Sequence, residues 1–321
     1  MAVYTEVSPD EASNLLTTLG LGDLQSIEPC KGGIENTNYF VTTDQGSYVL
    51  TLFERLTAQQ LPFYLKLMKH LARHHIPVPD PAANTLGDLQ YCVNGKPATV
   101  VNRLRGRSEL APTAGHCAAV GAMLARMHVA GQDFALSQPN LRGLPWWNET
   151  APVVLPYLNA EQASLLQSEL AYQNHLAASS DYAALPRGPV HADLFRDNVM
   201  FELDAVVPGQ TSDKLTGFFD FYFAGVDSFA FDLAVCLNDW CIDLPSGQDQ
   251  TAHVQAMLAA YSGVRTLGNA ELRVLTGLRR AGALRFWISR LWDFHLPREA
   301  SLLQPHDPRH FERVLRQRLA P

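Results

Sequence analysis

The chain has 321 residues, of which 47% are hydrophobic and 18% are charged, an ordinary composition for a folded protein with a sizeable core. Because single domains typically have about 100–200 residues, this length predicts one large two-lobed unit or two domains. The formal net charge of −7, without any Lys/Arg-rich run, argues against nucleic acid or an anionic membrane as the main partner.

Cysteine usage and hydropathy predict a cytoplasmic protein. The five cysteines are scattered and form neither a CxxC pair nor a zinc-type spacing, so we expect reduced and mostly buried thiols. Residues 1–11 are polar and acidic, without the basic region and apolar core of a signal peptide. The most apolar long stretch, 218–237, is interrupted by three aspartates, which excludes a membrane span.

The first hundred residues predict an antiparallel sheet with one main helix. Ser8 and Glu11 form a capping box at the start of a short N-terminal helix. Strand-like segments follow at 24–27, 37–42 and 47–53. Thr57 with Gln60 predicts a second capping box, and the main helix then runs until Pro77. Two further strands, 89–93 and 98–104, flank an Asn-Gly-Lys sequence that favours a type I′ turn.

A glycine-rich turn interrupts the first strands. The sequence at 31–38, Lys-Gly-Gly-Ile-Glu-Asn-Thr-Asn, contains two glycines and two asparagines that tolerate positive φ. Such a turn can aim backbone N–H groups and side-chain amides at phosphate oxygens. A plain hairpin turn fits the same pattern.

From residue 104 onward the sequence predicts long helices. They are expected at 116–129, 160–178, 248–261, 271–294 and 307–319. We therefore predict an α+β protein with a β-rich N-terminal lobe, 1–103, and a mostly helical C-terminal lobe, 104–321, joined by a candidate hinge at 103–107.

The stretch 191–198 carries the residue types needed for metal-assisted phosphoryl transfer. Asp193 can orient and deprotonate an attacking hydroxyl, and Arg196 can neutralise the transferring phosphoryl group. Asn198 and Asp220, the latter expected within a second apolar strand, offer the hard oxygen ligands that Mg²⁺ prefers. Each residue alone fits an ordinary turn, but their combination and spacing favour a kinase site.

The sequence His-Ala-Asp-Leu-Phe-Arg-Asp-Asn at 191–198 resembles the catalytic loop of the aminoglycoside phosphotransferase and choline kinase superfamily. That superfamily has a two-lobed, protein-kinase-like fold, which implies that 1–103 is the nucleotide-binding lobe and 104–321 the catalytic and substrate-binding lobe. Residues 217–221 and 231–234 resemble its metal-binding strand and the Asp-Leu-Ala segment beyond it. Within the superfamily, the segments especially similar to homoserine kinases of this fold are 33–39, 49–54, 61–65 and 191–201. The resemblance spans essentially the whole chain.

The resemblance implies an enzyme that uses ATP and Mg²⁺ to phosphorylate the side-chain hydroxyl of L-homoserine on the route to threonine. It implies Asp193 as the catalytic base and Asn198 and Asp220 as metal ligands. His191 and Asp232 would support the loop rather than take part in the chemistry.

The resemblance also places the nucleotide in the N-terminal lobe, with the 32–38 turn over the phosphates and the 100–103 backbone at the adenine. The cofactor-binding residues expected are Gly32, Gly33, Asn36, Thr37, Asn38, Val101 and Arg103. Many superfamily members carry Lys or Arg in the third strand, where this chain has Thr51. Lys31 or Arg55 could then replace that cation at the phosphates, or each could be a surface charge. The missing lysine also strengthens the expectation that Arg196 supplies positive charge to the transferring phosphoryl group.

Recognition of a zwitterionic amino acid requires an acid and an Arg, because a buried unpaired charge is costly. Residues 285–293 combine these types, with Arg285, Ser289 and Trp292 at i, i+4 and i+7. An amphipathic helix with aromatic residues in the core and arginines outside fits this segment as well.

Other functions stay open at this point. A different small-molecule kinase of the superfamily would act on choline, a sugar or an aminoglycoside. A nucleotide-binding pseudokinase that regulates a partner is the reading suggested by Thr51. A metallohydrolase using His191, Asp193 and Asp220 is a further alternative, although the sequence lacks the second His/Asp cluster that such sites commonly need.

Overall fold

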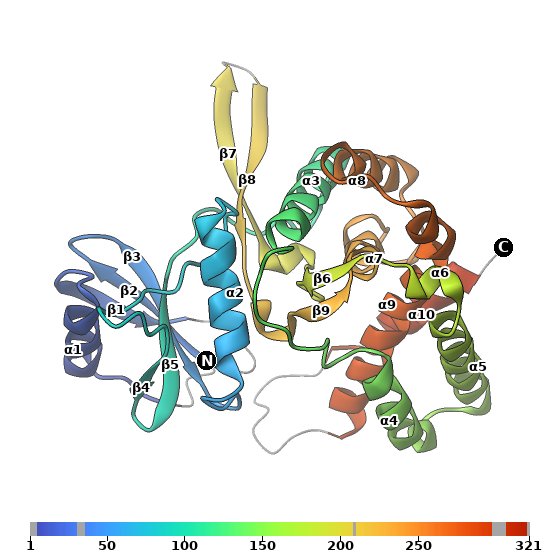
Figure 1. The fold of residues 1–321 in the computed structure, drawn as a ribbon, viewed down its shortest axis with the longest axis horizontal. Coiled ribbons are helices and arrows are strands. Elements are labelled where there is room, and N and C mark those ends of the chain that lie inside the picture. Colours follow the sequence, from blue (N-terminus) through green and yellow to red (C-terminus); the bar gives the residue numbers. More distant parts are fainter. Residues whose placement is uncertain (1–4, 31–35, 208–209, 297–305, 320–321) are drawn as a thin grey trace. The chain divides into compact units, whose positions relative to one another are not determined.

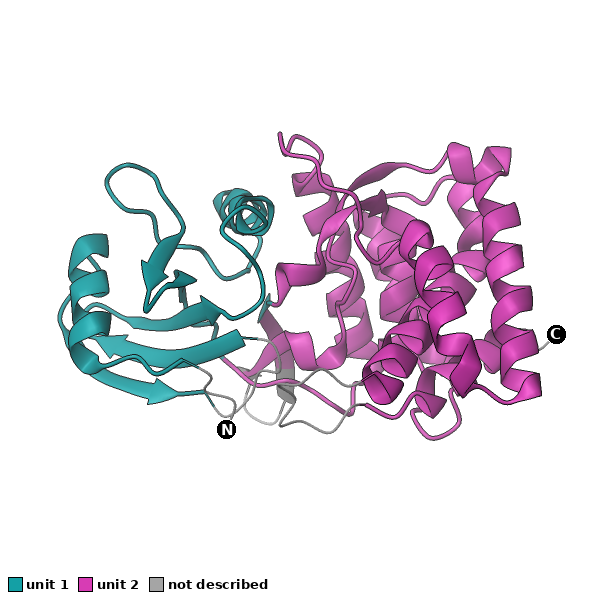
Figure 2. Ribbon diagram, turned by 90° about the horizontal axis from the view of Figure 1, so that it is seen from below, with its two compact units in different colours: residues 1–105, 217–219 teal, residues 106–216, 220–321 magenta. Residues whose placement is uncertain are grey.

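A computed structural model describes residues 5–30, 36–207, 210–296 and 306–319 (Figure 1). The chain divides into two compact units (Figure 2). Unit 1 comprises residues 1–105 and 217–219, and unit 2 comprises 106–216 and 220–321. The predicted division placed 217–219 in the second part, whereas the backbone contacts of these residues assign them to unit 1.

Unit 1 is built on a five-stranded antiparallel sheet of order β1-β2-β3-β5-β4. The strands are β1 (Leu24–Pro29), β2 (Asn36–Thr43), β3 (Ser47–Phe53), β4 (Tyr91–Val93) and β5 (Lys96–Asn102). Burial alternates strictly along β2, as expected for a strand with one face in the core. Side chains of this face pack with Ala12 and Leu16 of α1 (Pro9–Leu19) in one hydrophobic cluster.

Local sequence signals in unit 1 are confirmed, with one exception. The Ser8 and Glu11 capping box is present at the start of α1. Asn94 and Gly95 have φ angles of 51° and 74°, as a type I′ turn requires. The capping box predicted for Thr57 and Gln60 is wrong, because α2 (Leu61–Arg73) begins one residue after Gln60. Gln60 is instead the N-cap, and its side-chain oxygen accepts the N–H of Thr57 at 2.9 Å.

The described residues of unit 2 are mostly helical. The helices are α3 (Ala114–Ala130), α4 (Leu144–Val154), α5 (Ala160–Ala177), α6 (Ser180–Ala183), α7 (Phe229–Trp240), α8 (Thr251–Val264), α9 (Asn269–His295) and α10 (Arg309–Leu319). The five predicted helices are confirmed, whereas α4, α6 and α7 were not predicted. Side chains of α9 form a core cluster with those of α4, α7 and α10, so α9 is the central helix of this core.

Two two-stranded sheets lie outside the five-stranded sheet of unit 1. β6 (Arg187–Val190) pairs with β9 (Gly225–Ser228), and β7 (Val199–Val207) pairs with β8 (Gln210–Phe218). Asp220 was expected within a strand, but β8 ends at Phe218 and Asp220 has a left-handed backbone, with φ 70° and ψ 59°. This conformation is uncommon for a non-glycine residue and ends the extended backbone.

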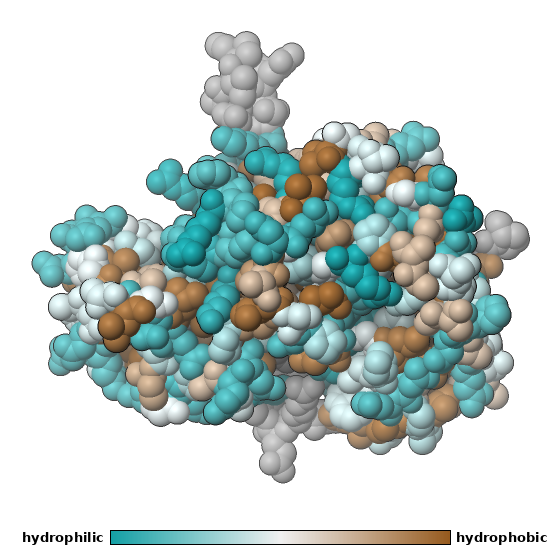
Figure 3. All heavy atoms as spheres, viewed as in Figure 1, coloured by the Kyte–Doolittle hydropathy of each residue, from teal (hydrophilic) through white to brown (hydrophobic). Residues whose placement is uncertain are grey.

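The surface is mixed in polarity, as expected from the ordinary proportions of hydrophobic and charged residues. On the face shown in Figure 3, hydrophobic side chains lie in small groups among hydrophilic ones. Among the described residues, no helix combines the length and the apolar character needed to traverse a lipid bilayer.

Candidate active site

The 191–198 loop is a compact turn between β6 and β7. The Phe195 N–H donates to the Asp193 carbonyl at 2.9 Å, and the Asn198 N–H donates to the Phe195 carbonyl at 3.0 Å. The side-chain amide nitrogen of Asn198 also donates to the Asp193 carbonyl, at 2.9 Å. These bonds bring Asp193 and Asn198 together, although five positions separate them in the sequence.

Asp232 of α7 holds the first part of this loop. Its fully buried carboxylate accepts the backbone N–H groups of His191 and Ala192, each at 2.8 Å, and lies 3.0 Å from Nε2 of His128. Burial acts to raise the pKa of Asp232, but the hydrogen bond from His128 and the loop contacts outweigh it and hold the pKa below its usual range. Ala192 has φ 64°, a strained conformation that needs such support. Asp232 therefore supports the loop, as predicted.

Asp239, about two turns further along the same face of α7, holds the second part of the loop. Its carboxylate accepts the backbone N–H of Arg196 at 2.8 Å and the side-chain Nε–H at 3.2 Å. The guanidinium also donates to the backbone carbonyls of Leu110, at 3.0 Å, and of Asp239. Arg196 is 7% exposed. These contacts favour a role for Arg196 in fixing the loop over the predicted role of facing a phosphoryl group.

The Asp193 side chain is mostly buried, with 16% of its area exposed. Burial raises the pKa of Asp193 to about 8, against the opposing effect of the Arg285 cation and with a contribution from the Asp220 charge. Nη1 of Arg285 lies 4.0 Å from Oδ1 of Asp193. The carboxylate is thus largely withdrawn from solvent.

Asn198 and Asp220 supply a donor set that fits Mg²⁺. The amide nitrogen of Asn198 is bound to the Asp193 carbonyl, which directs the amide oxygen to the opposite side of the group. The turn at Asp220 starts a short 3-10 helix, Phe221–Phe223, and the Asp220 charge acts on Asp193. A neutral amide oxygen with a carboxylate is a donor combination typical of hard divalent cations.

The residues predicted to bind nucleotide lie in unit 1. Thr37 is buried and donates from its hydroxyl to Glu54 at 2.7 Å, so its side chain is part of the sheet core. Asn38 accepts a 2.7 Å hydrogen bond from the hydroxyl of Thr51, its direct partner across β2 and β3. Thr51, at the position in β3 where the resemblance led us to look for a lysine, is therefore hydrogen bonded to Asn38 of the neighbouring strand.

Other predicted nucleotide contacts are only partly described. Asn36 is half-buried at the start of β2 and Val101 is buried in β5. The Arg103 guanidinium lies over the Phe40 ring, 3.8 Å from its centre. Arg55 is exposed. Lys31, Gly32 and Gly33 lie outside the described residues.

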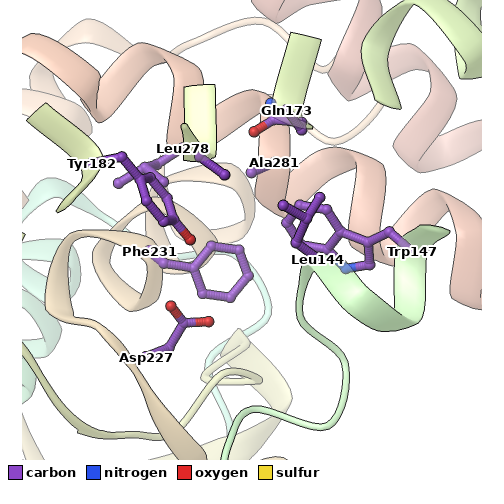
Figure 4. Close-up of a pocket in the computed structure, with 9 residues that line it drawn as sticks. Leu144, Trp147, Gln173, Tyr182, Asp227, Phe231, Leu278 and Ala281 are labelled. Atoms are coloured by element: carbon purple, nitrogen blue, oxygen red, sulfur yellow. The ribbon is translucent and has the colours of Figure 1, made fainter. Parts of the chain in front are cut away.

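A pocket in unit 2 lies away from these residues. Leu144 and Trp147 of α4 face Phe231 of α7 across it, with Asp227 at its rim (Figure 4). Its cavity volume is about 10 Å³, room for no more than about one water molecule. None of Asp193, Asn198 and Asp220 lines this pocket, so it is not the site at which phosphoryl transfer is expected.

Residues 26–267 match the sequence pattern of the phosphotransferase enzyme family. Over 320 residues the chain is 66% identical to a homoserine kinase of Polaromonas naphthalenivorans, covering 100% of this chain and 98% of that protein. The chain belongs to the phosphotransferase enzyme family, among the homoserine kinases. A homoserine kinase of Paraburkholderia phymatum is 56% identical, with 100% of this chain and 99% of that protein covered.

Solved structures of other kinases share the fold of this family member. An amicoumacin kinase in complex with AMP-PNP, Ca²⁺ and Ami superposes with a TM-score of 0.66 at 18% identity, covering 91% of this chain and 86% of that one. An aminoglycoside phosphotransferase from Alicyclobacillus acidocaldarius gives 0.64 at 14% identity, covering 98% and 92%. The predicted α+β, protein-kinase-like fold is confirmed.

Proposed function

We propose that the protein is a homoserine kinase that transfers the γ-phosphoryl group of ATP to the side-chain hydroxyl of L-homoserine. The observation that carries this proposal is the 66% identity over the full chain to a homoserine kinase. The product, O-phospho-L-homoserine, places the reaction on the route to threonine.

In this proposal unit 2 supplies the catalytic groups. Asp193 accepts the proton of the attacking hydroxyl, and its position is fixed by the hydrogen bonds within the 191–198 loop. Asn198 and Asp220 hold Mg²⁺, which when bound neutralises charge on the phosphate oxygens. Arg196, paired with Asp239, keeps the loop in place and does not contact the substrate.

Unit 1 supplies the nucleotide contacts. The backbone around Gly32, Gly33 and Asn36 is proposed to bind the phosphates, and the backbone at Val101 the adenine. Thr37 and Asn38 then act by holding β2 in register, since both side chains are hydrogen bonded within the sheet. Arg103 at the end of β5 is proposed to border the nucleotide, with its guanidinium on Phe40.

The proposal is tested by steady-state kinetics of the wild-type protein with ATP and Mg²⁺. L-homoserine, choline and an aminoglycoside are compared, and the phosphorylated product is identified by ³¹P NMR. We expect kcat/KM to be highest for L-homoserine by at least about 100-fold, the discrimination available to a site that pairs a substrate's charged groups. Equal or higher kcat/KM for choline or the aminoglycoside would overturn the proposed substrate.

A further inference from the structure

Arg285 of α9 is a buried cation whose hydrogen-bond donors are incompletely satisfied. It is 3% exposed, and its Nη2 atom has no hydrogen-bond partner among the residues that the structure describes. Oδ1 of Asp193 lies 4.0 Å from Nη1 of Arg285, within range of an ion pair but beyond hydrogen-bond distance. A guanidinium this deeply buried is costly unless its donors are satisfied.

Aromatic rings hold the guanidinium in this position. It lies 3.7 Å from the ring centre of Phe286 and 4.9 Å from that of Phe223, which directly follows the Asp220 turn. The other charges acting on Arg285 are Arg142, Asp293 and Arg290, of which two are also cationic. Arg285 was one of the sequence candidates for substrate recognition, and its burial contradicts the alternative in which the arginines of this helix face solvent.

We propose that Arg285 binds the α-carboxylate of the amino-acid substrate and thereby selects amino acids over amino alcohols. The inference rests on the proposed function. Of the charged groups on the two substrates, the phosphates are assigned to Mg²⁺ at Asn198 and Asp220. The homoserine carboxylate is then the anion that still needs a cation, and the planar guanidinium fork matches a carboxylate.

The distances suit this substrate. A hydroxyl activated by Asp193 must lie within about 3 Å of a carboxylate oxygen, and Arg285 is adjacent to that carboxylate. The carbon chain of homoserine separates its hydroxyl from its carboxylate by roughly 5 Å, at about 1.5 Å per bond. One molecule can therefore contact both side chains.

The test compares L-homoserine with 3-aminopropan-1-ol, which is homoserine without its carboxylate. We measure kcat/KM for both substrates in wild type, Arg285→Met and Arg285→Lys. In Arg285→Met, kcat/KM for homoserine should fall by about 100-fold, because hydrogen bonds between charged groups are strong. The kcat/KM for aminopropanol should stay within about threefold of the wild-type value, because this substrate has no carboxylate. Arg285→Lys keeps the positive charge, so it controls for the effect of charge removal on folding. It lacks the planar guanidinium that binds a carboxylate with two N–H groups, so it should also lose most of the preference for homoserine.

Arg273→Met is the matched control, because Arg273 lies on the same helix but is 59% exposed and pairs with Asp181 at the surface. It should preserve the preference for homoserine. If the Arg285 variants lose activity equally toward both substrates, Arg285 acts on Asp193 or on the phosphoryl group. The carboxylate-binding role of Arg285 is then wrong, while the proposed homoserine kinase activity still stands. If wild type does not phosphorylate homoserine at all, the proposed function fails and the inference with it.

Discussion

Replacing Asp232 by Asn should release the catalytic loop. The Asp232 carboxylate accepts two loop N–H groups at 2.8 Å and contacts His128 at 3.0 Å, and all of these groups are buried. An Asn side chain has one acceptor oxygen and brings an NH₂ group toward these donors. Breaking a buried charged network typically costs about 3–5 kcal/mol. We expect the free energy of unfolding to fall by that amount and kcat to fall, because Ala192 loses the bond that holds its positive φ.

Urea unfolding monitored by circular dichroism measures the stability change, and an ATP-coupled assay with homoserine measures kcat. Asp181→Asn is the control, because the Asp181–Arg273 pair has side-chain exposures of 35% and 59% and such surface pairs contribute only about 0–1 kcal/mol. An Asp232→Asn variant as stable and as active as Asp181→Asn would refute the reasoning.

Two further changes test the roles of other site residues. Asp220→Ala should lower kcat by at least about 100-fold at saturating Mg²⁺, because a metal ion contributes several kcal/mol to the transition state; near-normal turnover would show that Asp220 is not a ligand. Arg196→Met should lower the free energy of unfolding by about 3–5 kcal/mol, because Asp239 is left buried without its partner. A variant with unchanged unfolding but reduced kcat would instead place Arg196 at the phosphoryl group.

The elements of unit 1 could be predicted because their signals are local. The Ser8 capping box and the Asn94–Gly95 turn depend only on neighbouring residues, and both form as expected. The start of α2 was misplaced because Thr57 and Gln60 close a turn of their own before the helix. The Gln60 N–H donates to the Thr57 carbonyl at 3.0 Å and the Gln60 side chain accepts the Thr57 N–H, and the helix begins only at Leu61.

Helix α7 escaped prediction for a different reason. All of its residues are buried, so its sequence lacks the exposed polar face by which the other helices were recognised. Yet Asp232 and Asp239, seven positions apart on this helix, hold the two ends of the catalytic loop. The role of Asp239 depends on a contact with Arg196 across 43 positions of sequence, which no local pattern encodes.

The position of Arg285 likewise could not be settled from the sequence. Its spacing with Ser289 and Trp292 identified one side of a helix, but packing against the core of unit 2 decides which side is buried. The structure places Arg285 inside, next to Asp193. The residue types at fixed spacing in 191–198 therefore predicted a phosphoryl-transfer site. Tertiary packing determined that Arg285 is a cation beside Asp193.

The central claim is that Asp193 accepts the proton of the homoserine hydroxyl, and Asp193→Asn tests it most directly. The side chain keeps its size and shape but loses its negative charge and its basicity, and because burial disfavours that charge the fold should be retained. With saturating ATP, Mg²⁺ and homoserine, we predict a fall in kcat of about 10²–10⁴-fold, the usual contribution of a positioned general base. A kcat within about twofold of wild type, with O-phosphohomoserine still the product, would contradict the account.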